Sequence, residues 1–403
     1  MEKKQNVPAL RFQGFSGEWK RKTLGDFGNV AMNRRIFKEQ TSETGEIPFY
    51  KIGTFGKEPD AYISRQLFEE YKAKYPYPDV GDILLSAAGS IGKTVEYTGK
   101  DEYFQDSNIV WLKHDERLDN PFLKYFYSKV KWGTLEGGTV KRLYNKILLE
   151  TEIVLPEIIE QKKIGKFFAS YDRMIAHQEG KIRKLQQFRQ AMLTKLFPRE
   201  GAAEPELRFR GFSGKWKSQK MKDLGSFLKG KLYSKKNIQT SGVPLILYGR
   251  LYTQYELVID EVDTFAVPYE NSVWSIGGEV IVPASGETAE DIAIASVVKR
   301  KGILLGGDLN IIRPNDTVSS VFLALSISYG HIHNELAKRA QGKSIVHIHN
   351  SDLVQLDIRL PSIEEQKAIG DFFYQLDRYI SLQQKKLERM QRLKAALLEK
   401  LFV

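Results

Sequence analysis

The stretch AAGSIGKT, residues 87–94, contains the residue types of a phosphate-binding loop. In such loops a helix follows the Lys-Thr pair directly, because the backbone N–H groups of its first turn hold the phosphates. Here the next residues are VEYTGK, a β-branched segment that is interrupted by Gly99. A turn that presents Ser90 and Lys93 to a phosphate group of a polyanion requires fewer assumptions. A phosphate-loop ATPase that depends on Lys93 stays an alternative.

The string HIHN occurs twice, at residues 331–334 and 347–350, and four imidazoles could in principle surround a metal ion. The chain has no cysteine to complete such a site, and Arg142 and Tyr144 stand in the first half where His347 and His349 stand in the second. We therefore predict no metal site. For His347 and His349 we expect polar contacts with a polyanion or a partner.

Other catalytic patterns are incomplete. DNPF at residues 119–122 lacks one proline of the string with which adenine methyltransferases hold a flipped base. No G-x-G-x-x-G follows a predicted strand. Four glutamates stand where helices are predicted to begin, where they complement the helix dipole: Glu157, Glu160, Glu364 and Glu365. We predict no catalytic residue in this chain.

The chain is an internal duplication. LRFQGFSGEWK at residues 10–20 returns as LRFRGFSGKWK at residues 207–217, an offset of 197. PEIIEQKKIGKFFASYDRMI at residues 156–175 returns as PSIEEQKAIGDFFYQLDRYI at residues 361–380, an offset of 205. Between these segments the halves diverge, with only faint echoes. Matched ends with unmatched middles favour one scaffold that carries two different recognition surfaces.

Each half is predicted to contain a mixed α/β or α+β globular part followed by a long helix. In the first half the short β-branched and aromatic runs at 47–55, 81–89 and 107–113 indicate strands, and 121–131 indicates a helix. The second half repeats this series at 243–250, 277–285, 309–314 and 321–330. The predicted boundaries are 1–155 for the first globular domain, 156–198 for the central helix, 199–205 for a linker, 206–358 for the second globular domain and 359–403 for the C-terminal helix.

The long helices carry a heptad pattern that predicts an antiparallel coiled coil between the two copies, related by a pseudo-two-fold axis. Both copies place a cation at the same a position and a glutamine at the same d position, which fixes register at a cost in stability. The predicted seam is Ile175, Gln178, Ile182, Leu185, Arg189, Met192 and Leu196 in the first copy, and Ile380, Gln383, Leu387, Met390, Lys394, Leu397 and Leu401 in the second.

Composition excludes several classes of protein. The 403 residues are 42% hydrophobic, enough to form cores, and the longest apolar run, Ser320–Ser328, is too short to span a membrane. The N-terminus has no apolar segment of a signal peptide, and the lack of cysteine excludes disulfides and thiolate sites. We expect a cytoplasmic protein. The net charge of +11 favours a polyanionic partner.

The repeated segments resemble the specificity subunits of type I restriction–modification enzymes. The resemblance covers essentially the whole chain and depends on the LRFxGFxGxWK openings, the GD-ILLS…G and GG-T/S…N stretches, and the P-x-I-x-EQ-x-x-I-x-x-FF…D-R-x-I helix starts. One departure is Glu279, which replaces Asp82 of the GD motif but keeps the acid. The resemblance implies a non-catalytic subunit in which two target recognition domains each read half of a bipartite DNA site.

The resemblance also implies the partners. Two adenine methyltransferase subunits would dock on the helices, and through them two restriction–translocase subunits. S-adenosylmethionine, ATP and magnesium would be used by these partners, with no cofactor in this chain. A free-standing DNA-binding scaffold is the other alternative. The DNA-binding candidates are cations and neighbouring polar or aromatic residues in loops. They are Asn33, Arg34, Arg35, Lys38, Lys51, Lys57, Ser90, Lys93, Lys141, Arg142 and Tyr144 in the first half, and Lys229, Lys231, Tyr233, Lys235, Lys236, Arg250, Tyr252, Lys343, His347 and His349 in the second.

Overall fold

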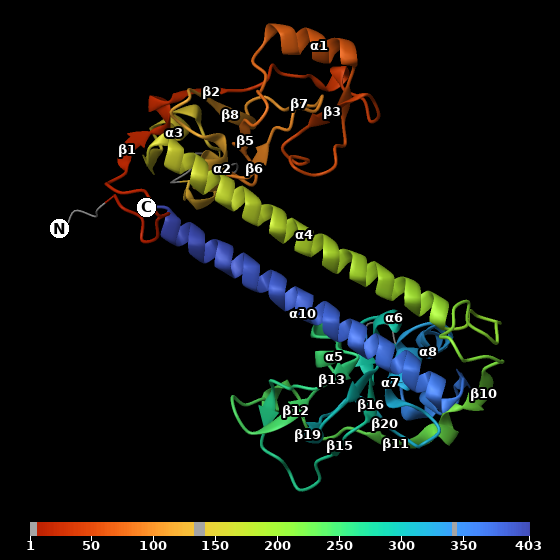
Figure 1. The fold of residues 1–403 in the computed structure, drawn as a ribbon. Coiled ribbons are helices and arrows are strands. Elements are labelled where there is room, and N and C mark those ends of the chain that lie inside the picture. The colour runs from red at the N-terminus through yellow and green to blue at the C-terminus, as the bar shows by residue number, and fades with distance from the viewer. Residues whose placement is uncertain (1–5, 133–141, 341–344) are drawn as a thin grey trace. The chain divides into compact units, whose positions relative to one another are not determined.

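The computed structural model describes residues 6–132, 142–340 and 345–403. The chain forms two compact units. Unit 1 comprises Met1–Glu179 with Lys386–Val403, and unit 2 comprises Gly180–Lys385. The units therefore differ from the sequential halves of the chain, because each long helix contributes residues to both. The fold is mixed helix and sheet, as predicted from the sequence (Figure 1).

Unit 1 contains a four-stranded sheet in the order β2-β8-β5-β6, a three-stranded sheet in the order β4-β3-β7, and the pair β1-β9. Its strands are β1 (Lys20–Thr23), β2 (Gly28–Ala31), β3 (Ile47–Tyr50), β4 (Tyr62–Ile63), β5 (Ile83–Ser86), β6 (Thr94–Glu96), β7 (Tyr103–Phe104), β8 (Ile109–His114) and β9 (Glu152–Leu155). Its shorter helices are η1 (Leu24–Asp26), η2 (Lys38–Gln40), α1 (Arg65–Lys74), α2 (Asn120–Lys129) and α3 (Asn145–Glu150).

Unit 2 contains a five-stranded sheet in the order β11-β20-β16-β18-β13, a four-stranded sheet in the order β14-β12-β19-β15, and the pairs β10-β22 and β17-β21. Its strands are β10 (Lys217–Lys220), β11 (Gly225–Lys229), β12 (Val243–Ile246), β13 (Val258–Ile259), β14 (Phe265–Ala266), β15 (Trp274–Ile276), β16 (Glu279–Pro283), β17 (Ser285–Gly286), β18 (Ser296–Val298), β19 (Lys301–Leu305), β20 (Leu309–Pro314), β21 (Val346–His347) and β22 (Asp357–Leu360). Its shorter helices are η3 (Met221–Leu224), η4 (Lys235–Asn237), α5 (Arg250–Thr253), α6 (Ala289–Ile292), α7 (Ser320–Ser328), α8 (His331–Arg339) and α9 (Asn350–Leu353).

The two units share one frame. In unit 1, Lys20 of β1 pairs with Leu155 of β9, and in unit 2 Lys217 of β10 pairs with Leu360 of β22. These pairs differ by the two repeat offsets, 197 and 205. The antiparallel order β2-β8-β5 likewise returns as β11-β20-β16. The repeated sequence segments therefore form the same strand pairing in both units, and this pairing supports the remaining loops.

The long helices α4 (Ile158–Leu196) and α10 (Ile363–Leu401) are each 39 residues long. Within unit 1 the start of α4 packs against the end of α10, since Asp172 pairs with Lys394 and the ring of Phe168 lies 6.3 Å from that of Phe402. Within unit 2, Arg189 near the end of α4 pairs with Asp377 near the start of α10. In each unit the contacting helix segments therefore run antiparallel.

All residues of the predicted seam are buried or half-buried, whereas most helix residues between them are exposed. Leu193 is also buried, although it lies outside the predicted a and d positions. The heptad pattern therefore marks the inward face of each helix within its unit, as expected for an apolar stripe that must be covered.

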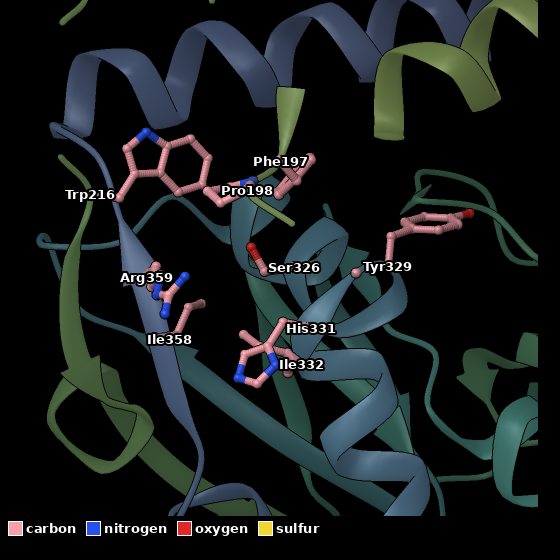
Figure 2. Close-up of a pocket in the computed structure, with 10 residues that line it drawn as sticks. Phe197, Pro198, Trp216, Ser326, Tyr329, His331, Ile332, Ile358 and Arg359 are labelled. Carbon is pink, nitrogen blue, oxygen red and sulfur yellow. The ribbon is translucent and has the colours of Figure 1, made fainter. Parts of the chain in front are cut away.

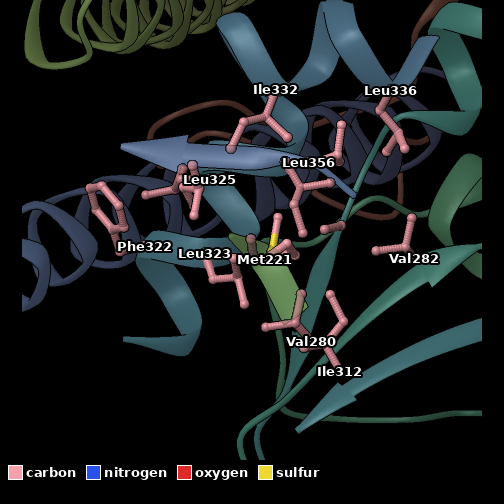
Figure 3. Close-up of a cluster of buried hydrophobic side chains, with 14 of the residues drawn as sticks. Met221, Val280, Val282, Ile312, Phe322, Leu323, Leu325, Ile332, Leu336 and Leu356 are labelled. Atoms are coloured by element: carbon pink, nitrogen blue, oxygen red, sulfur yellow. The ribbon is translucent and has the colours of Figure 1, made fainter. Parts of the chain in front are cut away.

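Each unit has its own hydrophobic core between sheet and helices. In unit 2 the side chains of Val280 and Ile312 from the sheet gather with Met221 and with Leu323 of α7 (Figure 3). The core of unit 1 is built in the same way around Phe122 of α2 and the strands β5 and β8. Among the described residues, no helix is long and apolar enough to cross a membrane.

Candidate nucleic-acid interface

The repeated opening segments anchor the far ends of the long helices. In unit 1, Trp19 packs on Phe122 and Phe402, and the rings of Phe122 and Phe402 stack at 4.9 Å. In unit 2, Trp216 packs in the same way on Phe197 and Phe322, whose rings stack at 5.4 Å. In each unit, the aromatic cluster beside the opening segment is thus completed by a phenylalanine at the end of the long helix from the other half of the sequence.

Two buried arginine–glutamate pairs hold the same segments. Arg11 donates hydrogen bonds of 2.8 and 2.7 Å to the carboxylate of Glu160, and Arg208 donates bonds of 2.7 and 2.6 Å to that of Glu365. Both glutamates are about 2% exposed. Sequence reasoning assigned these glutamates to the helix dipole and missed the arginine partners. The signal was present, because both members of each pair recur in the repeat.

The faint echoes in the middle of each half are brought together. Ala88 forms a β-bridge with Arg142, and Ser285 of β17 pairs with His347 of β21. The side chain of Arg142 donates a hydrogen bond to the carbonyl oxygen of Ser107 at 2.9 Å, and Tyr144 is 47% exposed. The loop after β5 or β16 therefore lies beside the loop before α3 or α9 in both units. Lys141 and Lys343, two further candidates on these loops, lie outside the described residues.

Lys93 does not sit in a phosphate-binding loop. Its ammonium group donates a hydrogen bond to the carbonyl oxygen of Phe55 at 2.5 Å and lies 6.0 Å from the ring centre of the same residue. The chain continues from Lys93 into strand β6, so no helix N-terminus faces the loop. Ser90 is exposed, and its carbonyl oxygen accepts a hydrogen bond from Ser86. The geometry therefore does not favour the phosphate-loop alternative.

The loop between β2 and η2 carries two exposed arginines, Arg34 and Arg35. The guanidinium of Arg34 lies 5.3 Å over the ring of Tyr75, and Arg35 pairs with Asp106 at 2.9 Å. With Met32, Phe37 and Pro76 these residues line a concavity of about 490 Å³. Its arginines offer donors to phosphates or to guanine.

Some candidates are placed differently from a DNA contact. Asn33 is 2% exposed, and its amide donates to the carbonyl oxygen of Pro76. Lys51 pairs with Asp60 at 2.9 Å, whereas Lys38 and Lys57 are exposed. Burial removes the side chain of Asn33 from the candidate surface in this conformation.

In unit 2 the exposed cations cluster in KGKLYSKK, residues 229–236, where Lys229, Lys231, Lys235 and Lys236 all reach the surface. Tyr233 of the same segment is 3% exposed, so it belongs to the core and not to the candidate surface.

Arg250 and Tyr252 are also engaged inside the protein. The Arg250 side chain is 9% exposed and pairs with Glu256 and Asp263 at 2.8 and 2.6 Å. The hydroxyl of Tyr252 donates to the carbonyl oxygen of Ser285 at 2.8 Å, and burial raises its pKa. These two predicted contacts therefore act as supports beneath the loops. Sequence reasoning could not separate them from surface residues, because it had no measure of burial.

The histidines divide into two groups. His347 and His349 are exposed with parallel rings 6.4 Å apart, and His347 shares a hydrogen bond of 3.1 Å with the hydroxyl of Ser285. His333 is hydrogen-bonded to the carbonyl oxygen of Ala293. In the part of the chain that the structure describes, no group of three histidines lies close enough together to bind one metal ion.

His331 has a different setting. It lies close to Glu200 and Glu335, with one potential ligand atom of each within 4.8 Å of the others. Glu335 also pairs with Lys338 at 3.0 Å. His331 lines a pocket with Phe197, Trp216 and Arg359 at the end of α4 (Figure 2). The expected lack of a metal site stays a prediction.

Comparisons with known proteins agree with this geometry. A putative type I restriction enzyme specificity subunit from Haemophilus influenzae is 55% identical over 152 residues, which are 38% of this chain and 40% of that protein. The specificity subunit of the type I restriction enzyme MjaVIII from Methanocaldococcus jannaschii is 24% identical over 329 residues, covering 78% of this chain and 74% of that protein.

Solved structures share the fold. The S subunit of a type I restriction–modification system from M. genitalium matches with a TM-score of 0.65 and 16% identity, covering 98% of this chain and 99% of that one. A chain from a structure of the type I R-M system matches with a TM-score of 0.53 and 16% identity, covering 95% and 97%. Residues 16–187 and 213–392 both match the type I restriction modification DNA specificity domain, and the chain belongs to that family, as the sequence resemblance predicted.

Proposed function

We propose that this chain is the DNA-recognition subunit of a type I restriction–modification complex and that each unit reads one half of a bipartite DNA target. The family membership and the net charge of +11 support this function. DNA binding proteins obtain most of their affinity from cations that neutralise phosphates, and their specificity from side chains at base edges. The loops of each unit carry exposed cations together with exposed aromatic or imidazole side chains.

The observation that carries the proposal is a shared frame with different surface residues. With the offset of 197, Arg35 in the loop before η2 corresponds to Leu232 in the loop before η4, and buried Ile36 corresponds to buried Tyr233. The order of strand, loop and short helix thus repeats, while the outward residue changes from a cation to an apolar residue and only Leu232 of the two has a positive φ. Two such units would read different half-sites.

The proposal extends to partners and cofactors. Two methyltransferase subunits would dock on the helices, and two ATP-dependent restriction–translocase subunits would join through them. S-adenosylmethionine, ATP and magnesium would be bound by these partners, and this chain would be non-catalytic. The names of the relatives support a place in such a complex, and the setting of Lys93 supports the lack of nucleotide chemistry.

The helices are proposed to set the spacing between the half-sites. Each helix has 39 residues, or about 58 Å at about 1.5 Å per residue, and contributes to both units. Inserting four residues near Gly180, about one helical turn, should lengthen the non-specific gap by one or two base pairs and leave both half-sites unchanged. Methylation at the original spacing would contradict this role.

The experiment that tests the function is a map of methylated adenines in host DNA with and without this chain. Methylation at one bipartite sequence should depend on the chain. Exchange of residues 205–355 for those of another specificity subunit should then change one half of that sequence only. A change in both halves would overturn the assignment of one half-site to each unit. Failure to co-purify with a methyltransferase subunit would favour the free-standing scaffold.

A further inference from the structure

Leu232 is held in a backbone conformation that leucine rarely adopts. Its φ is +72°, and the N–H of Tyr233 donates to the carbonyl oxygen of Lys231 at 2.9 Å. This hydrogen bond between residues two apart, with a positive φ at the central residue, defines a γ-turn of the type that is rare and strained. The turn leaves the Leu232 side chain 53% exposed. An exposed leucine gains nothing from such strain in the isolated protein.

The surrounding structure enforces the turn. The hydroxyl of Tyr233 lies 2.5 Å from that of Ser272, and its ring stacks on Tyr269 at 5.2 Å. On the other side of the turn, a Cβ at Gly230 would lie 1.8 Å from the carbonyl oxygen of Gly306, so only glycine permits this close approach. Backbone strain that is maintained by contacts with surrounding residues is typical of functional sites.

The charge around the turn is complementary to DNA. Lys229, Lys231, Lys235 and Lys236 flank Leu232 within the same segment, and all are exposed. Within residues 6–132, 142–340 and 345–403, none of these ammonium groups pairs with a carboxylate. The apolar tip is therefore surrounded by cations that are available to phosphates.

The equivalent position of unit 1 points outward as well. Arg35 precedes buried Ile36 as Leu232 precedes buried Tyr233, and its side chain is 60% exposed beside Asp106. The two loops thus expose a residue at the same distance before η2 and η4, an arginine in unit 1 and a leucine in unit 2, and only the leucine has a positive φ.

We propose that Leu232 makes an apolar contact with bases of the half-site that unit 2 reads. Apolar side chains recognise DNA by packing on the methyl group of thymine or by inserting between base steps. The lysines bind the flanking phosphates, and the strained turn holds the leucine at a defined depth. This inference rests on the proposed function and names the residue through which unit 2 discriminates.

The test uses the full-length chain and two DNA duplexes, one with the mapped target and one with the unit 2 half-site scrambled. Leu232→Gly keeps the turn, relieves its strain and removes the side chain. For this variant, the Kd for the scrambled duplex divided by the Kd for the target duplex should be roughly five- to ten-fold lower than for the wild type, the size of one lost base contact. The Tm of Leu232→Gly should equal that of the wild type or exceed it by up to about 3 °C. Leu207→Ala, which truncates another exposed leucine of unit 2, is the matched control and should leave the ratio unchanged.

The outcomes separate the inference from the proposed function. If the wild-type chain does not distinguish the two duplexes, the proposed function fails. If the wild type distinguishes them and Leu232→Gly does so equally well, only the assignment of Leu232 is overturned. A target with deoxyuridine in place of thymine separates the two forms of contact. If deoxyuridine lowers the affinity of the wild type but not that of Leu232→Gly, Leu232 packs on a thymine methyl group, and if it lowers both equally or neither, Leu232 inserts between bases.

Discussion

Arg189 of α4 and Asp377 of α10 form a two-point ion pair, in which Nε and Nη2 of the guanidinium donate to the two carboxylate oxygens, the latter at 3.0 Å. The offset of 205 converts this pair into Lys394 and Asp172, which pair at 2.5 Å in unit 1. Each cation of the predicted seam thus meets an aspartate of the facing helix segment. Burial disfavours the charge of Arg189, but the hydrogen bonds and charge of Asp377 outweigh it and raise its pKa.

Removing the acid of the Arg189–Asp377 pair should have a large effect on the free energy of unfolding. Asp377→Ala should lower the free energy of unfolding of unit 2 by about 2 kcal/mol, because a half-buried guanidinium loses its counter-charge. Asp172→Ala should have a comparable effect on unit 1, because it removes both the counter-charge of Lys394 and the acceptor for the hydroxyl of buried Tyr125 at 2.8 Å. Thermal and urea denaturation of both variants measure this. Equal and negligible losses would show that the pairs do not hold the helices in register.

Glycines of the long helices should respond to alanine in opposite directions. A Cβ at Gly165 would lie 2.7 Å from Cβ of Pro121 and 2.8 Å from the backbone nitrogen of Phe122, whereas Gly180 has open space around it. Gly165→Ala should therefore destabilise by about 1–3 kcal/mol through overpacking against α2. Gly180→Ala should stabilise by about 1 kcal/mol through helix propensity. Urea denaturation measures both, and a stable Gly165→Ala protein would contradict the close contact of α4 with α2.

Asp119 predicts a pH-dependent stability. Its carboxylate caps α2 by accepting from the backbone N–H of Phe122 at 3.1 Å, and burial raises its pKa above the ordinary value of 3.8. The folded state therefore favours the protonated form of Asp119. Its ionisation lowers the free energy of unfolding as the pH rises from the ordinary pKa toward the raised pKa of the folded state. Asparagine is an equally good cap without the charge.

We expect Asp119→Asn to raise the Tm at pH 7, with the gain shrinking as the pH is lowered toward 4. Asp119→Ala is the control, since it loses the cap and should be less stable by about 1 kcal/mol than Asp119→Asn at either pH. Unit 2 has the neutral residue Ser319 at the corresponding N-cap. A constant difference between Asp119→Asn and the wild type across this pH range would refute the titration of this carboxyl.

Lys93 and Lys236 should differ in their effect on DNA binding. Lys93 is bonded to a backbone carbonyl, so Lys93→Ala should cost about 1 kcal/mol of stability and leave the salt dependence of DNA affinity unchanged. Lys236 is exposed, and Lys236→Ala should reduce the slope of log K against log salt by about 1. Fluorescence anisotropy at several salt concentrations measures both slopes. Calorimetric titration with ATP should show no binding by either variant or by the wild type, and measurable binding would restore the phosphate-loop alternative.

The sequence by itself determined the duplication, three strands and one short helix in each half, and the position of the long helices. These depend on local periodicity and on repeated strings such as the one that contains Trp19 and Trp216, which any alignment of the two halves shows. The predicted central helix covers residues 156–198, and the observed α4 runs from Ile158 to Leu196. The family also followed from the sequence, because the repeated motifs are specific in both type and order.

Only the tertiary structure decided which residues meet and which remain exposed. The pairs Arg11–Glu160 and Arg189–Asp377 join residues 149 and 188 positions apart, and no local pattern encodes such a distance. For the same reason, the lysine-rich segment gave no sign that Tyr233 is buried while Leu232 is exposed. Hydrophobicity alone predicts the reverse for leucine. The strained turn between Gly230 and Tyr233 is enforced by residues distant in the sequence, namely Tyr269 and Ser272 between β14 and β15 and Gly306 after β19.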